Sequence, residues 1–126
     1  MLHDILSQYL AGIENSIRKL EDVNVENYEE EVLTSSRVNL RIRVRFLSGY
    51  LLELNEAVVL DANQITHLGY RYHFQDHHNN LIFRYDNTPH FAGLKSFPHH
   101  KHLGNKVEES DMPLILNVIE EAKNLA

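Results

Sequence analysis

Apolar residues near the N-terminus recur at steps of three and four residues, with no proline between them. This spacing predicts an amphipathic helix whose apolar stripe must be covered by a sheet or a partner. The stripe comprises Leu6, Tyr9, Leu10, Ile13, Ile17 and Leu20. A second helix is expected at the end of the chain, where Ser110 or Asp111 can cap it and Pro113 fits its first turn. Its expected buried stripe comprises Ile115, Val118, Ile119 and Ala122.

Between these helices the hydrophobic period shifts towards two, and β-branched and aromatic residues become frequent. This pattern predicts four or five strands. The clearest strand is 37–47, in which apolar and polar residues alternate throughout. The expected strands span 23–33, 37–47, 50–60, 65–76 and 81–86.

The turn at 48–49 is expected to be longer than two residues. A two-residue loop would set Val44 opposite Glu53. One further loop residue sets Val44 opposite Leu54 and Arg45 opposite Glu53, which matches apolar to apolar and base to acid.

The segment 87–105 contains prolines and glycines and shows no sustained period. We therefore expect an ordered but irregular loop, rich in histidine, before the last helix. Long irregular segments in compact domains often carry function. The predicted fold is α+β, a four- to five-stranded antiparallel sheet with an N-terminal and a C-terminal helix. A chain of 126 residues fits a single domain, 1–126.

The composition indicates a reducing compartment. The chain has no cysteine, so it can form neither a disulfide nor a cysteine-ligated zinc site. Its start lacks the basic segment and the uninterrupted apolar run of a signal peptide, and no stretch approaches the roughly 20 apolar residues of a membrane span. We expect a cytoplasmic protein without a membrane partner.

Basic charge and histidine are concentrated in one part of the chain. The net charge is −6, which argues against nucleic-acid binding over the whole surface. Residues 67–106 nevertheless hold five lysines and arginines against two aspartates, together with eight of the nine histidines. We expect the chemistry of the protein there. A second basic stripe, Arg41, Arg43 and Arg45, could face RNA, but a solvated strand paired with Glu53 is the favoured interpretation.

A hairpin over 70–87 would bring four charged groups together. Any symmetric loop around 78–79 places His73 opposite Arg84 and Arg71 opposite Asp86, with aromatic residues on the other face. An imidazole beside two guanidiniums suits phosphodiester cleavage, because histidine moves protons near neutral pH and arginine stabilises charge on phosphate oxygens. The arginines should lower the pKa of His73 and so favour it as the general base.

The general acid of such a reaction could come from the following loop, where Lys101 could also add affinity for phosphate. The candidates for the acid are His90, His99, His100 and His102. An alternative stays open, because charged residues on the open face of an antiparallel sheet are often only solvated. Arg71 and Asp86 would then form an ordinary surface pair.

The run from His99 to His102 raises a metal site as a further alternative. Imidazoles two or three residues apart can share an ion, and histidine without cysteine suits Zn, Ni or Cu. Against this, the nearest acid after the run is Glu108, and Lys101 puts a positive charge inside the site. We therefore expect neither a metal nor a cofactor.

Four motifs stand in order along this region: YRYHFQD at 70–76, LIFRYDN at 81–87, PH at 89–90 and FPHHKH at 97–102. Over about residues 38–105 this pattern resembles the TumE-like toxins of prokaryotic toxin–antitoxin modules. The resemblance implies a small cytoplasmic toxin whose partner is a helix-turn-helix antitoxin. Such proteins often have a second histidine after Pro-His, where this chain has Phe91, so that role is absent or is taken by a neighbour. The matching positions are Tyr72, His73, Arg84, Asp86, Asn87, His90, Pro98, His99, His100 and His102.

These observations together predict the toxin of a type II module that cleaves RNA without a metal. His73 is the expected base, Arg84 and Arg71 the phosphate clamps. The expected acid is one of His99, His100 and His102. The expected substrate-binding residues are Tyr72, Asp86, Asn87, His90 and Lys101. Two alternatives are a histidine-ligated metal enzyme or module, and a toxin that acts only by binding a protein through its acidic N-terminal helix. The exposed helix stripes permit a homodimer.

Overall fold

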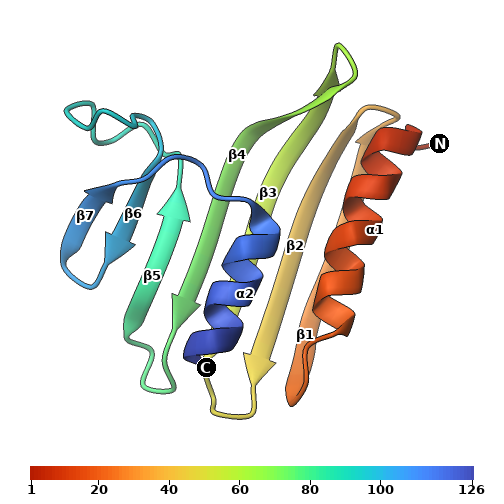
Figure 1. Ribbon diagram of the computed structural model, residues 1–126. Coiled ribbons are helices and arrows are strands. Elements are labelled where there is room, and N and C mark those ends of the chain that lie inside the picture. The colour runs from red at the N-terminus through yellow and green to blue at the C-terminus, as the bar shows by residue number, and fades with distance from the viewer.

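The computed structural model describes residues 1–126 as an antiparallel sheet with a helix at each end of the chain (Figure 1). The helices are α1 (Asp4–Arg18) and α2 (Ile115–Leu125). The strands are β1 (Val23–Thr34), β2 (Arg37–Phe46), β3 (Leu51–Asp61), β4 (Gln64–Gln75), β5 (Leu81–Asp86), β6 (His100–Leu103) and β7 (Lys106–Glu109). They lie side by side in sequence order, so each strand pairs with the one before it.

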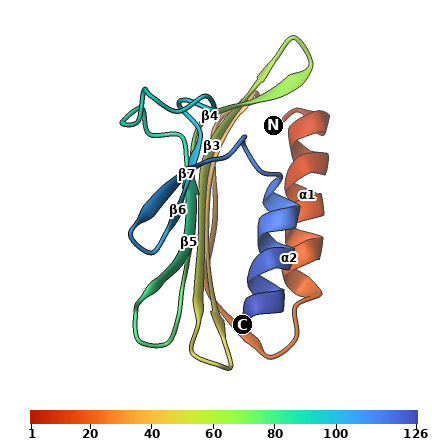
Figure 2. The ribbon, with the colours of Figure 1, turned by 60° about the vertical axis from the view of Figure 1, so that its left-hand side comes forward.

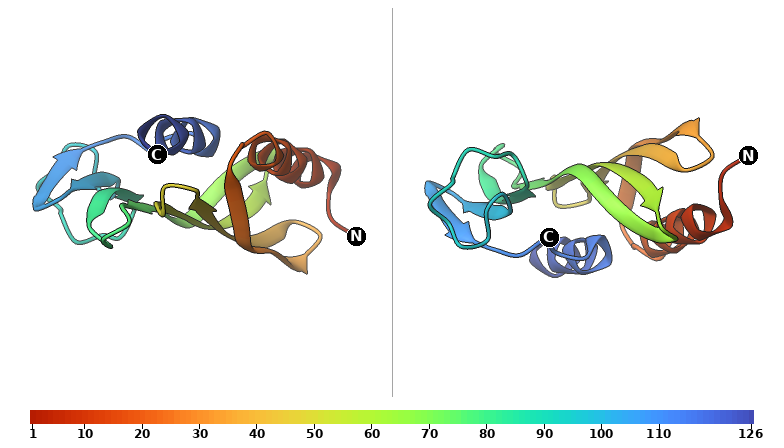
Figure 3. Two further views of the ribbon diagram at one scale, coloured as in Figure 1. Left: turned by 90° about the horizontal axis from the view of Figure 1, so that it is seen from below. Right: turned by 90° about the horizontal axis from the view of Figure 1, so that it is seen from above.

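Both helices lie on the same face of the sheet (Figures 2 and 3). We call this the helix face, and the other, which carries no helix, the open face. α1 lies over β1 and β2, and α2 lies over the middle of the sheet (Figure 1). Neither helix combines the length and the apolar character that crossing a membrane requires.

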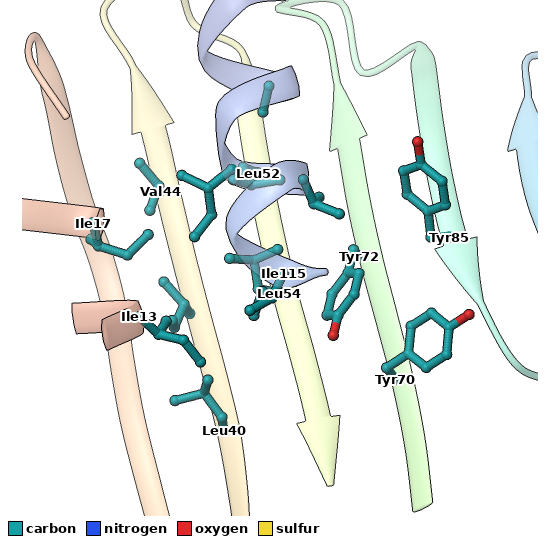
Figure 4. Packing of buried hydrophobic residues seen from close by; sticks show 14 of the residues in the cluster. Ile13, Ile17, Leu40, Val44, Leu52, Leu54, Tyr70, Tyr72, Tyr85 and Ile115 are labelled. Carbon is teal, nitrogen blue, oxygen red and sulfur yellow. The ribbon is translucent and has the colours of Figure 1, made fainter. Parts of the chain in front are cut away.

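The core is a single layer between the sheet and the two helices. Alternate strand residues point towards the helices, so Ile13 and Ile17 of α1 face Leu40 and Val44 of β2 (Figure 4). Burying one such side chain stabilises the fold by about 1.5–3 kcal/mol. The predicted apolar face of 37–47 and the predicted stripe of α2 are confirmed. The buried members are Val38, Leu40, Ile42, Val44, Phe46, Ile115, Val118, Ile119 and Ala122.

The sheet has seven strands, whereas the sequence predicted four or five. The two additional strands, β6 and β7, lie partly within the segment predicted to be an irregular loop. Each is only four residues long, too short to show a hydrophobic period. β6 instead forms because the outer edge of β5 offers unpaired backbone groups. Gly104 and Asn105, which fall in the predicted loop, form the two-residue turn between β6 and β7.

The β2–β3 turn is longer than two residues, as predicted, but the predicted register is wrong by two residues. Val44 lies opposite Leu52, not Leu54, and Glu53 lies opposite Arg43, not Arg45. Because a shift of two residues keeps every side chain on its face, apolar still meets apolar and base still meets acid. Gly49 makes the turn with a φ of 90°, which favours glycine.

The last helix begins later than predicted. Its N-cap is Leu114, which makes no side-chain capping bond, so neither Ser110 nor Asp111 caps it. Pro113 lies before the helix, not in its first turn. The segment 110–114 is used instead to carry the chain from β7 at the edge of the sheet to the helix face (Figure 2).

Candidate functional site

Three neighbouring strands place six polar side chains in two rows on the open face. The predicted hairpin pairs are confirmed, since His73 lies opposite Arg84 and Arg71 opposite Asp86. β6 then extends both rows, because His102 lies opposite Arg84 and His100 opposite Asp86. Facing residues of paired strands have Cβ atoms about 5 Å apart. The rows therefore bring side chains from β4, β5 and β6 into one patch. The rows are Arg71, Asp86 and His100, and His73, Arg84 and His102.

A pocket of about 290 Å³ lies over this patch. Its far wall comes from the segment between β5 and β6, where the ring of Phe91 packs edge-on against His100 and His102 with centroids 4.9 and 5.8 Å away. Phe91, which follows His90 in the sequence, thus forms part of the pocket wall. The lining residues are Arg71, Arg84, Asp86, Thr88, His90, Phe91, His100 and His102.

Asp86 is the centre of the pocket floor. The residue is 5% exposed, and its Oδ1 lies 2.8 Å from His100 Nε2. Its Oδ2 lies 3.6 Å from both Arg84 Nε and His102 Nε2. The backbone N–H of Thr88 also donates to Oδ1, over 3.0 Å. Asp86 therefore contacts His100, His102 and Arg84, and no ion pair joins it to Arg71.

His102 and Arg84 are the two pocket side chains whose hydrogen-bonding groups are not all used within the protein. Burial, followed by the positive charge of Arg84, lowers the pKa of His102. Its side chain keeps 18% of its surface exposed. The Nε of Arg84 is buried and has no hydrogen-bond partner. The Arg84 side chain as a whole keeps 27% of its surface exposed, so an anion or a hydroxyl that enters the pocket can contact the exposed parts of Arg84 and His102.

His73 lies beside Arg84 but does not line the pocket. Burial is the largest cause that lowers its pKa, and the charges of Arg71 and Arg84 act in the same direction, against an opposing hydrogen bond to Gln75. The predicted direction of the shift, a lowered pKa for His73, is confirmed. Its Nε2 lies 2.8 Å from Gln75 Oε1, an acceptor, so Nε2 carries the proton. The remaining nitrogen, Nδ1, is enclosed and has no partner.

Two further predicted residues face the helices and lie away from the pocket. The Tyr72 hydroxyl is fully buried and donates to Glu56 Oε1 over 2.6 Å. The ring of His99 stacks on Tyr70, with its Nδ1 2.9 Å from the Tyr70 hydroxyl. Tyr72 faces the helices because successive residues of β4 point to opposite faces, whereas His99 lies just before β6 begins.

Lys101 also points to the helix face. Its Nζ lies 3.2 Å from Glu121 of α2 and 4.6 Å from the centre of the Tyr85 ring. Burial disfavours the charge, but hydrogen bonds to Tyr85 and Glu121 outweigh it and raise the pKa of Lys101. This lysine therefore anchors α2, and it places no positive charge in the pocket.

A shallower groove of about 510 Å³ continues from the pocket across β4, β3 and β2. The two hollows share Arg71 and Thr88. Asn87 lines this groove, where its Oδ1 accepts from the backbone N–H of Tyr70 over 3.1 Å. Arg41 lines it too and forms no ion pair.

The rest of the predicted basic stripe is neutralised. Arg43 pairs with Glu26 at 2.8 Å and with Glu53 at 3.4 Å, and Arg45 pairs with Glu26 at 3.3 Å. The expected pairing with Glu53 therefore holds for Arg43. Only Arg41 of the three stays available to a ligand, which the sequence alone did not distinguish.

A polar network under the helices was not predicted. Glu56 has a fully buried side chain and accepts hydrogen bonds from Tyr9 and Tyr72, with His67 Nε2 3.5 Å away. Burial, then the charge of Glu56, raises the pKa of both tyrosines. The available signal was the position of Glu56, which continues the apolar alternation of Leu52 and Leu54. Its contacts are internal, so we assign it to stability.

The fold and the pocket define a class: a small meander-sheet α+β protein with imidazoles and guanidiniums gathered in one surface pocket on its open face. The comparisons narrow this class. The family model described as "Toxin TumE" matches residues 13–125, so the chain belongs to the TumE toxin family. The suspected resemblance is thereby confirmed. No curated protein and no solved structure matches the chain.

Proposed function

We propose that this toxin is the effector of a type II toxin–antitoxin module, that it cleaves RNA in the cytoplasm without a metal ion, and that a helix-turn-helix antitoxin restrains it. One observation carries the proposal. Two guanidiniums, Arg71 and Arg84, and two imidazoles, His90 and His102, line the same pocket of about 290 Å³. This combination supports charge stabilisation on a phosphate together with proton transfer.

The arginines hold the phosphate in this proposal. Arg71 is exposed at the junction of pocket and groove, and the Arg84 side chain, 27% exposed, lines the pocket. Guanidinium binds phosphate oxygens through paired N–H donors, so the two side chains can hold the scissile phosphate from two sides. The groove lined by Arg41 then takes the neighbouring nucleotides.

We assign the base to His102 in preference to His73. The His102 side chain reaches the pocket, whereas His73 uses Nε2 on Gln75 and has its Nδ1 enclosed. His73 then acts as a positioning residue for Arg84. His90 is exposed at the rim and becomes the acid, while His100 holds Asp86.

The reaction is a transesterification within the RNA chain. His102 takes the proton of a ribose 2′-hydroxyl as the 2′ oxygen bonds to phosphorus. The bond from phosphorus to the 5′ oxygen breaks, and that oxygen takes a proton from His90. The products are a 2′,3′-cyclic phosphate and a 5′-hydroxyl, so atoms and charges balance.

The test is incubation of the purified chain with a labelled RNA in the presence of a chelator. We expect cleavage to products with a cyclic phosphate end, and no cleavage when the nucleotide 5′ to the cut is 2′-deoxy. R84Q should abolish cleavage, and K123Q, on the distant α2, should not. Intact RNA at stoichiometric protein, or equal cleavage of the 2′-deoxy substrate, would refute the proposal.

The partner is tested separately. Co-expression with a helix-turn-helix protein encoded beside this chain should abolish growth arrest and yield a complex on size exclusion. Growth arrest that survives R84Q and H102Q would favour a toxin that acts only by protein binding.

A further inference from the structure

Three donor groups at the floor of the pocket have the arrangement of a metal site. Asp86, His100 and His102 each present one ligand atom, and the three atoms lie within 4.8 Å of one another. Asp86 and His100 are 5% and 2% exposed. The set is built by strand pairing, since β5 supplies the carboxylate and β6 supplies both imidazoles from the same face.

Both ring nitrogens of His100 face oxygen atoms that accept hydrogen bonds. Its Nδ1 lies 2.9 Å from the carbonyl oxygen of Pro98, and its Nε2 lies 2.8 Å from Asp86 Oδ1. Both contacts are with acceptors, so a neutral ring leaves one lone pair aimed at an oxygen. A proton shared between His100 and Asp86 resolves this conflict, and so does a metal ion bound by both groups in place of that proton.

Neighbouring backbone groups hold His100 and Asp86 in place in the way that is usual for metal ligands. A metal-bound histidine almost always donates its other N–H to a carbonyl or a carboxylate, and a ligating carboxylate is itself hydrogen-bonded. His100 meets the first condition through Pro98, and Asp86 meets the second through the backbone N–H of Thr88 at 3.0 Å. Both supports come from the backbone and so need no further side chain.

The two objections raised from the sequence do not apply to this set. The acid is Asp86, from the neighbouring strand, so a distant Glu108 is not needed. Lys101 points away, to Glu121 on the helix face. His99, the third member of the predicted histidine set, also points away.

The positive charge of Arg84, 3.6 Å from Asp86, remains and limits the affinity for a cation. Two imidazoles and one carboxylate leave one or two coordination positions open towards the pocket, as in zinc sites with three protein ligands. Arg84 and Arg71 line that pocket and favour an anion at the open position.

We propose that Asp86, His100 and His102 bind one divalent ion of the type that imidazole favours, Zn²⁺ in the first place. The bound ion occupies Nε2 of His102 and lies where the phosphate must bind, so it inhibits RNA cleavage. The inhibition rests on the function proposed above, whereas the binding does not.

Binding is tested by calorimetric titration of the intact chain with Zn²⁺, and by Co²⁺ absorption in the visible range. We expect one ion per chain. H102Q, which removes a partly exposed ligand, should weaken binding by more than about 100-fold, because loss of an outer partner alone costs 10- to 100-fold. H99Q is the matched control, since this neighbouring histidine faces the helices.

Zn²⁺ should raise the melting temperature of the wild-type chain and of H99Q, and leave that of H102Q unchanged. Absence of binding, or binding that H102Q retains and H99Q loses, would overturn the site. In the cleavage assay, inhibition of wild type and H99Q should follow the binding curve and reverse with chelator. Cleavage that rises with Zn²⁺ overturns the inhibition. If no RNA is cleaved in the presence of chelator, while the separate calorimetric titration shows one Zn²⁺ bound per chain, the metal-free nuclease is refuted and the metal site stays supported.

Discussion

Replacing His102 with glutamine should slow RNA cleavage by about 10²- to 10⁴-fold, the contribution of a general base. This corresponds to about 2.7–5.4 kcal/mol of transition-state stabilisation. The loss stops there because Arg71 and Arg84 remain to hold the phosphate. The fold should persist, since the His102 side chain is partly exposed and its nearest charged partner, Asp86, lies 3.6 Å away.

His73 provides the matched comparison, because it lies on the opposite side of Arg84 in the same row. H73Q should reduce cleavage far less, as its free nitrogen is enclosed and the side chain does not line the pocket. Single-turnover rates with saturating protein and chelator measure the chemical step, and thermal denaturation of each variant verifies folding. A rate for H73Q as low as that of H102Q, with both variants folded, would return the base to His73 and refute the assignment.

Three further predictions concern the groove, the buried network and pH. R41Q should weaken RNA binding and reduce the slope of log affinity against log salt by about one unit, while the cleavage rate of bound RNA stays unchanged. An unaltered slope would contradict the proposal that the groove lined by Arg41 binds RNA. Y72F removes a donor from buried Glu56 and should lower the free energy of unfolding by about 1–3 kcal/mol, whereas Y28F should not, since the Tyr28 hydroxyl has no partner; equal denaturation midpoints would contradict this. Burial lowers the pKa of His73 below its unfolded value of about 6.5, so the folded state binds fewer protons than the unfolded state near that pH. The protein should therefore lose stability as the pH falls below about 6.5. H73Q should lose less between about pH 7.5 and about pH 5.5 in thermal denaturation, and an identical loss would show that His73 does not contribute.

The features that the sequence alone predicted depend on local spacing. The stripe of α2 and the buried face of β2 follow from periods of 3.6 and two, which backbone geometry imposes on any helix or strand. The register of the β4–β5 hairpin was also predictable, because a symmetric turn leaves one pairing in which aromatic meets aromatic. His73 therefore lies opposite Arg84 as expected.

The β2–β3 hairpin shows how far that reasoning extends. Alternating apolar residues distinguish one face from the other, so a slip of one residue was excluded. They do not distinguish registers that differ by two residues. The pairing of Val44 with Leu52 depends on the conformation of the 47–49 loop, in which Gly49 adopts a positive φ.

The pocket itself was decided by tertiary structure. The four residues of β6 have no period of their own and become a strand only through the edge of β5. That pairing separates two neighbours, sending His100 to the open face and Lys101 to α2. The sequence showed a cluster of histidines and one aspartate some distance before it. Which of these side chains share the floor of the pocket was determined by the pairing of β6 with β5. That pairing joins two strands that residues 87–99 separate along the chain, and a single sequence does not specify it.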